Sequence, residues 1–245
     1  YFLFLQIIFP KFPPSHFQFH FLQKDALKGD KWWWEGCTGQ NFTDILPSPE
    51  GIPLFFMTKT IFNEKQAYGI DNAVDAMTFL WSAINHENKF VAIDTETTGL
   101  YPRDGYILGI SVSYQKDHGA YIVSDVIDDV IEDLLQRLFN KKRVVFHNAK
   151  FDIAMLEYHF NFKFPNFEDT MLLHYCLEEQ PGTHGLKQLA IKYTPYGDYE
   201  KELHEWIDGY RKSHRILKSD FTWDSVPYDI MKTYAAMDAI CTLLL

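Results

Sequence analysis

The clearest hydrophobic pattern of the chain is the apolar run at residues 90–93, which leads directly into Asp94-Thr95-Glu96. A short apolar run followed by a breaker, here Gly99, is typical of a buried strand. Side chains two residues apart on a strand project to the same face, so Asp94 and Glu96 are expected to stand side by side. Two such carboxylates repel each other and lose hydration, which favours a divalent cation between them. Taken alone, the pair is equally consistent with a solvated strand end.

Similar patterns predict further elements along the chain. Apolar runs of strand length occur at 53–62, 106–114, 119–123 and 143–147. Helical periodicity and capping residues occur at 71–84, 127–139, 148–158, 169–177, 183–193, 199–210 and from 227 onward. The short polar connection after 106–114 predicts an antiparallel hairpin, and the helix before 143–147 predicts a β–α–β crossover. The sequence therefore predicts an α/β fold with helices packed on a sheet.

Composition places the chain among globular proteins. Its 245 residues are 47% hydrophobic and 23% charged, enough for one large domain with an appendage. Residues 1–53 are rich in aromatic residues and proline and are interpreted as an N-terminal extension of unknown role. Residues 54–245 carry the predicted elements and form the expected domain. The net charge of −10 argues against strong unaided binding to a phosphate backbone, so metal ions or a basic neighbouring domain would have to offset it.

The three cysteines, Cys37, Cys176 and Cys241, are far apart and odd in number, which favours reduced thiols and a cytoplasmic location. No uncharged apolar stretch reaches about 18 residues, so no membrane partner is expected. The chain starts without methionine and ends in a run of leucines, which suggests that it is truncated from a longer protein.

Two later segments repeat one spacing of polar residues. Asn148 and Asp152 are four residues apart, as are Tyr234 and Asp238, and on a helix this spacing places both members on one face. Taken singly, each pair is better explained by an ordinary feature: the first by a capping asparagine with a surface acid, the second by a half-buried tyrosine in an ordinary helix. Together with Asp94 and Glu96 they supply four carboxylates, which favours a metal site.

At these residues the chain resembles a known family. The segments 94–100, 147–152 and 234–238 resemble the three motifs of the DEDD superfamily of 3′–5′ exonucleases, and Tyr234 indicates the DEDDy branch. The segments 169–173 and 184–190 further resemble the proofreading domain of family A, polymerase-I-like DNA polymerases, especially those of phages. The resemblance extends from about residue 54 to the C-terminus.

The resemblance implies an RNase H-like (DnaQ-like exonuclease) fold with a mixed five-stranded sheet. It implies hydrolysis of the 3′-terminal phosphodiester of single-stranded DNA with release of nucleoside monophosphates. Four carboxylates suit two divalent ions, Mg²⁺ or Mn²⁺, one to generate the nucleophile and one to stabilise the leaving oxygen. The expected metal ligands are Asp94, Glu96, Asp152 and Asp238. Tyr234 is expected to orient the attacking water, since an unperturbed phenol is a poor base at neutral pH.

Three residues are expected to contact the substrate. Leu100 lies six residues past the first aspartate, where family members place a leucine against the terminal base. It is equally consistent with a leucine that packs in the turn. Asn148 resembles an asparagine that contacts the terminal nucleotide, and it is equally consistent with a helix cap. Thr97 completes the expected set, whereas Asp169 is interpreted as a residue that opens a helix.

The expected partners are the 3′ end of single-stranded DNA and a polymerase domain, in cis or as a separate subunit. If a phage encodes the chain, it works in the cytoplasm of the bacterial host. One alternative is an RNA 3′-end exonuclease resembling ribonuclease D, with the same acids. Another is a non-catalytic scaffold domain, which the retention of all four carboxylates and Tyr234 argues against.

Overall fold

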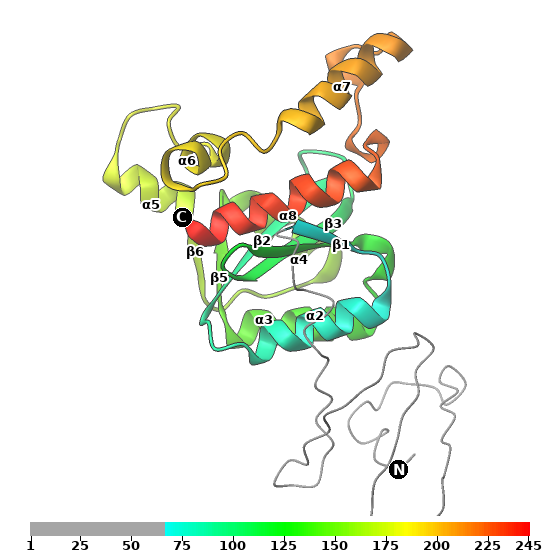
Figure 1. The fold of residues 1–245 in the computed structure, drawn as a ribbon. Coiled ribbons are helices and arrows are strands. Elements are labelled where there is room, and N and C mark those ends of the chain that lie inside the picture. Colours follow the sequence, from blue (N-terminus) through cyan, green and yellow to red (C-terminus); the bar gives the residue numbers. More distant parts are fainter. Residues whose placement is uncertain (1–66) are drawn as a thin grey trace, which may run out of the picture. The chain divides into compact units, whose positions relative to one another are not determined.

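The computed structural model describes residues 67–245. The predicted extension at 1–53, the domain boundary at 54 and the strand expected at 53–62 lie outside the described residues. The described part is one mixed sheet with helices on both faces, which confirms the expected α/β class (Figure 1). None of the helices between residues 67 and 245 is both long and apolar enough to cross a membrane.

The sheet has six strands, in the spatial order β1-β4-β3-β2-β5-β6. The strands are β1 (Ala67–Ile70), β2 (Phe90–Thr97), β3 (Ile107–Gln115), β4 (His118–Val123), β5 (Arg143–Phe146) and β6 (Phe167–Asp169). The expectation of five strands is corrected by this count. The sequence does not predict the two outer strands, β1 and β6, because one contains a glycine and the other ends in two acids, residue types that are depleted in strands.

Strand β2 lies near the middle of the sheet. It pairs antiparallel with β3 and parallel with β5, and its apolar residues Val91, Ala92 and Ile93 are completely buried. The hairpin between β3 and β4 and the crossover through α3 to β5 are confirmed. Paired on both sides, β2 is a rigid support for the acids at its end.

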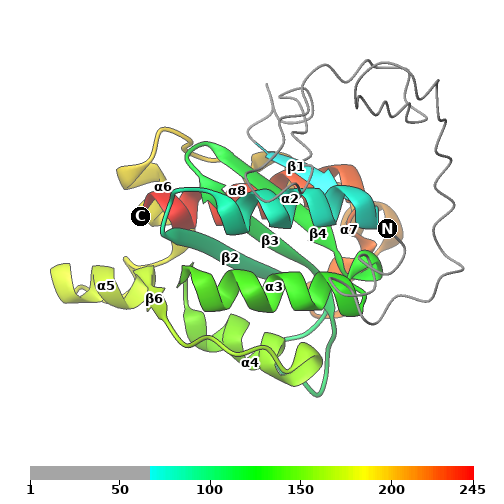
Figure 2. The ribbon, with the colours of Figure 1, turned by 90° about the horizontal axis from the view of Figure 1, so that it is seen from below.

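Seven α-helices surround the sheet within residues 67–245. They are α2 (Ala73–Asn85), α3 (Asp129–Lys141), α4 (Ala149–Phe160), α5 (Thr170–Leu177), α6 (Leu186–Tyr193), α7 (Lys201–His214) and α8 (Tyr228–Leu244). Helices α2 and α3 pack side by side on one face of the sheet, and α8 crosses the opposite face (Figures 1 and 2). Because α8 contacts β1, β2, β3 and β4, its position relative to β2 is fixed by the core.

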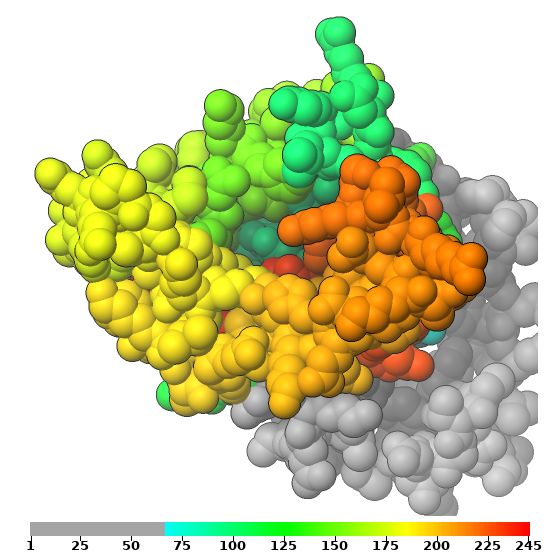
Figure 3. Space-filling model, turned by 90° about the horizontal axis from the view of Figure 1, so that it is seen from above, coloured from blue at the N-terminus to red at the C-terminus, as the bar shows by residue number. Residues whose placement is uncertain are grey.

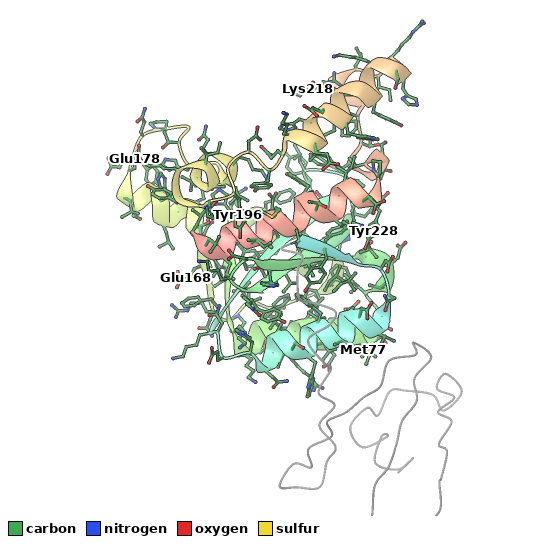
Figure 4. All side chains as sticks on the ribbon, in the orientation of Figure 1. Met77, Glu168, Glu178, Tyr196, Lys218 and Tyr228 are labelled. Atoms are coloured by element: carbon green, nitrogen blue, oxygen red, sulfur yellow. The ribbon has the colours of Figure 1, made fainter. Side chains whose placement is uncertain are left out.

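Close approach of α8 to the sheet depends on two glycines. A Cβ atom on Gly119 would lie 2.8 Å from the carbonyl oxygen of Ala236, and one on Gly69 would lie 2.2 Å from the hydroxyl of Tyr228. Figure 4 shows Tyr228 at the start of α8, beside β1. Glycine at 119 lets the backbone of α8 lie directly on β4, and glycine at 69 leaves room for the side chain of Tyr228.

Three predicted helix starts are corrected. The first helix is capped by Asn72 instead of Asp71, and its side chain accepts a hydrogen bond from the backbone N–H of Asp75 at 3.0 Å. Helix α6 begins at Leu186 instead of 183, and α7 covers 201–214 instead of 199–210. Such shifts of a few residues are the usual precision of boundaries read from capping residues.

Candidate active site

Asp94 and Glu96 lie near the end of β2, as the strand pattern predicts. The register between β2 and β3 shifts between Glu96 and Thr97, and such irregularities redirect side chains next to functional sites. Figure 3 shows a hollow in this part of the surface, with blue-green and red atoms, the colours of β2 and α8, at its floor. Segments coloured green, yellow and orange, from other parts of the chain, surround it.

Helix α8 brings a third carboxylate to this position. Asp238 is only 5% exposed, and one oxygen from each of Asp94, Glu96 and Asp238 lies within 4.8 Å of the other two. We call these three residues the acid trio. All donors are carboxylate oxygens, which suits hard cations such as Mg²⁺ or Mn²⁺. The residues therefore fit the divalent ion that the sequence predicts.

The electrostatics of the acid trio also favour a cation. Burial raises the pKa of Asp94 and Glu96 well above the ordinary values, and the nearby carboxylates of Asp238 and Asp152 raise it further. Lys187 opposes this rise. Without a cation, burial and the neighbouring carboxylates therefore disfavour the charged forms of Asp94 and Glu96.

Asp152 is the fourth predicted ligand, and its place differs from that of the other three. It is buried in the first turn of α4, and its Oδ1 accepts hydrogen bonds from the backbone N and Oγ1 of Thr95 at 3.0 and 2.7 Å. Burial raises the pKa of Asp152 to about 7, although the bonds from Thr95 lower it. Asp152 is thus close enough to raise the pKa of Asp94 and Glu96. Its oxygens are not among the three that lie within 4.8 Å of one another.

Tyr234 lies on α8, one turn before Asp238, as predicted. Its ring stacks on Trp223 with a centroid separation of 5.9 Å and lies 6.4 Å from the ring of Tyr199. Burial, and then the charge of Asp238, raises the pKa of Tyr234 well above 10. The phenol is therefore protonated at neutral pH, so it can donate a hydrogen bond and cannot act as a base.

Lys187 is a site residue to which the sequence patterns assigned no role. Its Nζ donates hydrogen bonds to Asp238 Oδ1 and to the hydroxyl of Tyr199, and it lies 4.3 Å from the centre of the Tyr234 ring. One signal for it exists in the sequence. Lys187 occupies the first turn of α6, where the helix dipole disfavours a positive charge and an acidic partner offsets that cost.

The three predicted substrate residues have different environments. Leu100 is 77% exposed in the turn after β2, so it is not a leucine that packs in the turn. Thr97 is buried, and its Oγ1 donates to the carbonyl oxygen of Gly99 at 2.9 Å, so its hydroxyl shapes this turn. Asn148 is exposed at the N-cap of α4 with φ of 69°, and its side chain makes no capping hydrogen bond.

Asp169 explains why Asn148 is not needed as a cap. The carboxylate of Asp169 accepts hydrogen bonds from the backbone N–H groups of Asn148 and Ala149, at 3.0 and 2.9 Å. It also accepts from Met171 at 2.9 Å at the start of α5, where a helix-opening role was predicted. One buried carboxylate therefore serves the N-termini of two helices.

Comparisons with known proteins identify the family of the chain. Residues 72–245 match the sequence profile of the 3′–5′ exonuclease family of the kind found in family A DNA polymerases. The chain is 48% identical over 163 residues to the DNA polymerase of Escherichia phage T5, covering 63% of this chain and 19% of that protein. It is 27% identical over 193 residues to DNA polymerase I of Rhizobium leguminosarum, covering 67% of this chain and 18% of that protein. The chain therefore spans about a fifth of the length of these polymerases.

Solved structures confirm the fold. The catalytic core of RRP6 from Trypanosoma brucei superposes with a TM-score of 0.54 at 18% identity, covering 76% of this chain and 47% of that one. The RNase D of the same organism, solved in complex with RNA U12, gives 0.55 at 15% identity, with coverage of 72% and 60%. The predicted RNase H-like exonuclease fold is therefore confirmed.

Proposed function

Since this chain belongs to the 3′–5′ exonuclease family of family A DNA polymerases, we propose that it removes nucleotides from the 3′ end of single-stranded DNA. Each cycle hydrolyses the terminal phosphodiester and releases one nucleoside monophosphate. The observation that carries this proposal is the acid trio, three carboxylates from a central strand and a facing helix within 4.8 Å of one another. The identity to a phage DNA polymerase favours DNA over RNA as the substrate.

In this proposal Asp94, Glu96, Asp152 and Asp238 are the ligands of two divalent ions, Mg²⁺ or Mn²⁺. The bound ions would lower the pKa of a water and neutralise charge on the phosphate and the leaving oxygen. The water oxygen attacks phosphorus, the bond from phosphorus to the 3′ oxygen breaks, and that oxygen takes up a proton.

The protonated hydroxyl of Tyr234 donates a hydrogen bond that orients the attacking water, in the manner of the DEDDy branch. Burial and the neighbouring rings of Trp223 and Tyr199 hold the phenol in place for this role. Leu100 is exposed beside the end of β2, where it packs against the terminal base. The side chain of Asn148, which caps no helix, contacts the terminal nucleotide. Thr97 contributes through the turn that presents Leu100.

The biological role we propose is proofreading for a DNA polymerase. The relatives are polymerases about five times longer than their match to this chain, which supports a polymerase domain in cis or as a separate subunit. The phage relative supports action in the cytoplasm of a bacterial host.

The test uses single-stranded DNA and RNA of one sequence, each with a 5′ fluorophore, incubated with the protein and Mg²⁺ or Mn²⁺. We expect a ladder of DNA products shortened from the 3′ end, no reaction in EDTA, and no reaction with Asp94→Ala. Faster shortening of the RNA would instead support the ribonuclease D-like alternative. If folded protein degrades neither strand, the scaffold alternative holds. Equal activity of Asp94→Ala would contradict the assigned site.

A further inference from the structure

Lys187 is surrounded by groups from two other segments of the chain, α8 and residues 199–200. Its Nζ donates to Asp238 on α8 and to the Tyr199 hydroxyl at 3.0 Å, and it lies 3.5 Å from Oε1 of Glu200. It also lies over the rings of Tyr199 and Tyr234, with distances of 4.5 and 4.3 Å to the ring centres. A lysine held by two carboxylates and two aromatic faces has a built environment and is not a freely solvated side chain.

The charge of Lys187 affects Asp94 and Glu96 as well as Asp238. Asp94 and Glu96 are crowded against Asp238, and Lys187 is the group whose positive charge favours their ionised forms. A divalent ion that binds the acid trio supplies the same compensation with twice the charge. An ammonium group on Asp238 would repel that ion strongly at such short range in a buried site.

We infer that Lys187 is a built-in counter-ion that pairs with Asp238 in the metal-free protein and leaves this carboxylate when a divalent ion binds. The inference rests on the proposed metal-dependent function. Glu200, at 3.5 Å, is the carboxylate that receives the displaced ammonium group. The flexible lysine stem allows so short a movement without a change in the backbone. Because Lys187 also covers the Tyr234 ring, metal binding changes the contacts of the residue that orients the water.

The inference is tested by measuring Mn²⁺ affinity without nucleic acid, from free Mn²⁺ in electron paramagnetic resonance spectra. We expect Lys187→Met to bind Mn²⁺ about tenfold more tightly, since loss of one half-buried ion pair removes the competitor. The melting temperature of the metal-free variant should fall, because the acid trio loses its counter-ion. Lys187→Arg keeps the charge and should remain near the wild-type affinity.

Lys192→Met is the matched control. Lys192 lies on the same helix, forms a salt bridge with Glu178 at 2.8 Å and lies 5.0 Å from the centre of the Tyr193 ring, away from the acid trio. This variant should leave Mn²⁺ affinity unchanged. Unchanged or weaker Mn²⁺ binding by Lys187→Met would overturn the inference.

A second variant keeps the inference testable if Lys187→Met does not fold. Glu200→Gln removes the carboxylate that receives the displaced ammonium group, so it should weaken Mn²⁺ binding, and no change would overturn the inference. If affinities change as expected while DNA stays intact, only the proposed nuclease function fails. If DNA is degraded while Lys187→Met leaves affinity unchanged, only the Lys187 inference fails. If the wild-type protein binds no Mn²⁺, both fail.

Discussion

The acid trio, in which Asp94 is half-buried and the other two acids are buried, and the buried Asp169 belong to the same sheet and helix framework, and their surroundings differ. Asp169 accepts hydrogen bonds from backbone N–H groups at the starts of two helices. The acid trio faces mainly other carboxylates, with Lys187 as the nearby cation. A buried carboxylate that accepts hydrogen bonds stabilises the fold, whereas carboxylates crowded together destabilise it until a cation binds between them.

Asp152 lies between these two cases. Thr95 donates two hydrogen bonds to one of its oxygens, as backbone donors do for Asp169, while its pKa rises to about 7 because it is buried. The comparison shows that burial and acidity do not by themselves identify a metal ligand. The kind of donor differs: Asp169 accepts from backbone N–H groups at the starts of two helices, whereas Asp238 accepts from the side chains of Lys187 and Tyr199.

The largest expected effect is the loss of nuclease activity when an acid of the trio is replaced. Asp94→Asn should lower the rate of DNA shortening by about 10³-fold, because it removes a metal ligand that contributes several kcal/mol to the transition state. The same change should raise the melting temperature of the metal-free protein, since one repelling charge is gone. Thermal unfolding followed by circular dichroism measures the second effect. Asp133→Asn, at an exposed ion pair on α3, is the control.

Replacing Asp169 should destabilise the protein, in contrast to Asp94→Asn. Asp169→Ala should lower the free energy of unfolding by about 3 kcal/mol, because backbone N–H groups at the starts of two helices lose their acceptor. Urea unfolding measures the loss, which should be the same with and without Mg²⁺. Asp169→Asn keeps an accepting oxygen and should lose less. A more stable Asp169→Ala variant would contradict the distinction between the two kinds of acid.

Lowering the pH should stabilise the metal-free protein. The folded pKa of Asp152, about 7, lies above the value near 3.9 of an aspartate in the unfolded chain. The folded form therefore binds the proton more tightly, and this contribution to stability is complete below about pH 4 and lost as the pH rises through about 7. The raised pKa values of Asp94 and Glu96 act in the same direction.

Between pH 8 and pH 5.5 the melting temperature of the metal-free protein should rise by on the order of 5 °C. Saturating Mg²⁺ should remove most of this dependence, and Asp152→Asn should reduce it, whereas Asp169→Asn should retain it. A melting temperature that falls on acidification in the absence of metal would show that Asp94, Glu96 and Asp152 do not bind protons as described.

The smallest effect is expected at Tyr234, which is neutral at physiological pH. Tyr234→Phe removes one hydrogen bond to the water and should slow turnover about tenfold, which corresponds to one modest interaction in the transition state. Mn²⁺ affinity should stay within about twofold of wild type, because the phenol holds no ion. A loss of metal affinity instead would assign the hydroxyl a role among the ligands.

Much of the fold and site is predictable from local sequence. The apolar run before Asp94 predicts β2, and the spacing of Asp94 and Glu96 predicts their common face, because alternation is a property of the strand itself. The helical spacing of Tyr234 and Asp238 predicts their shared face on α8 in the same way. The local sequence does not predict strands β1 and β6. Strand β1 pairs with β4 and β6 pairs with β5, and both partners are distant in the sequence.

The sequence by itself determined the strand, the helices and the acidic residues that they carry, since periodicity depends on neighbouring residues. Only the tertiary structure decided which of these acids lie together. The glycines of the sheet let α8 come close enough to place Asp238 beside Asp94 and Glu96. Packing of α6 against α8 brought Lys187 to Asp238, a contact between residues 51 apart. Charges that meet across the fold depend on core packing, which no local pattern encodes.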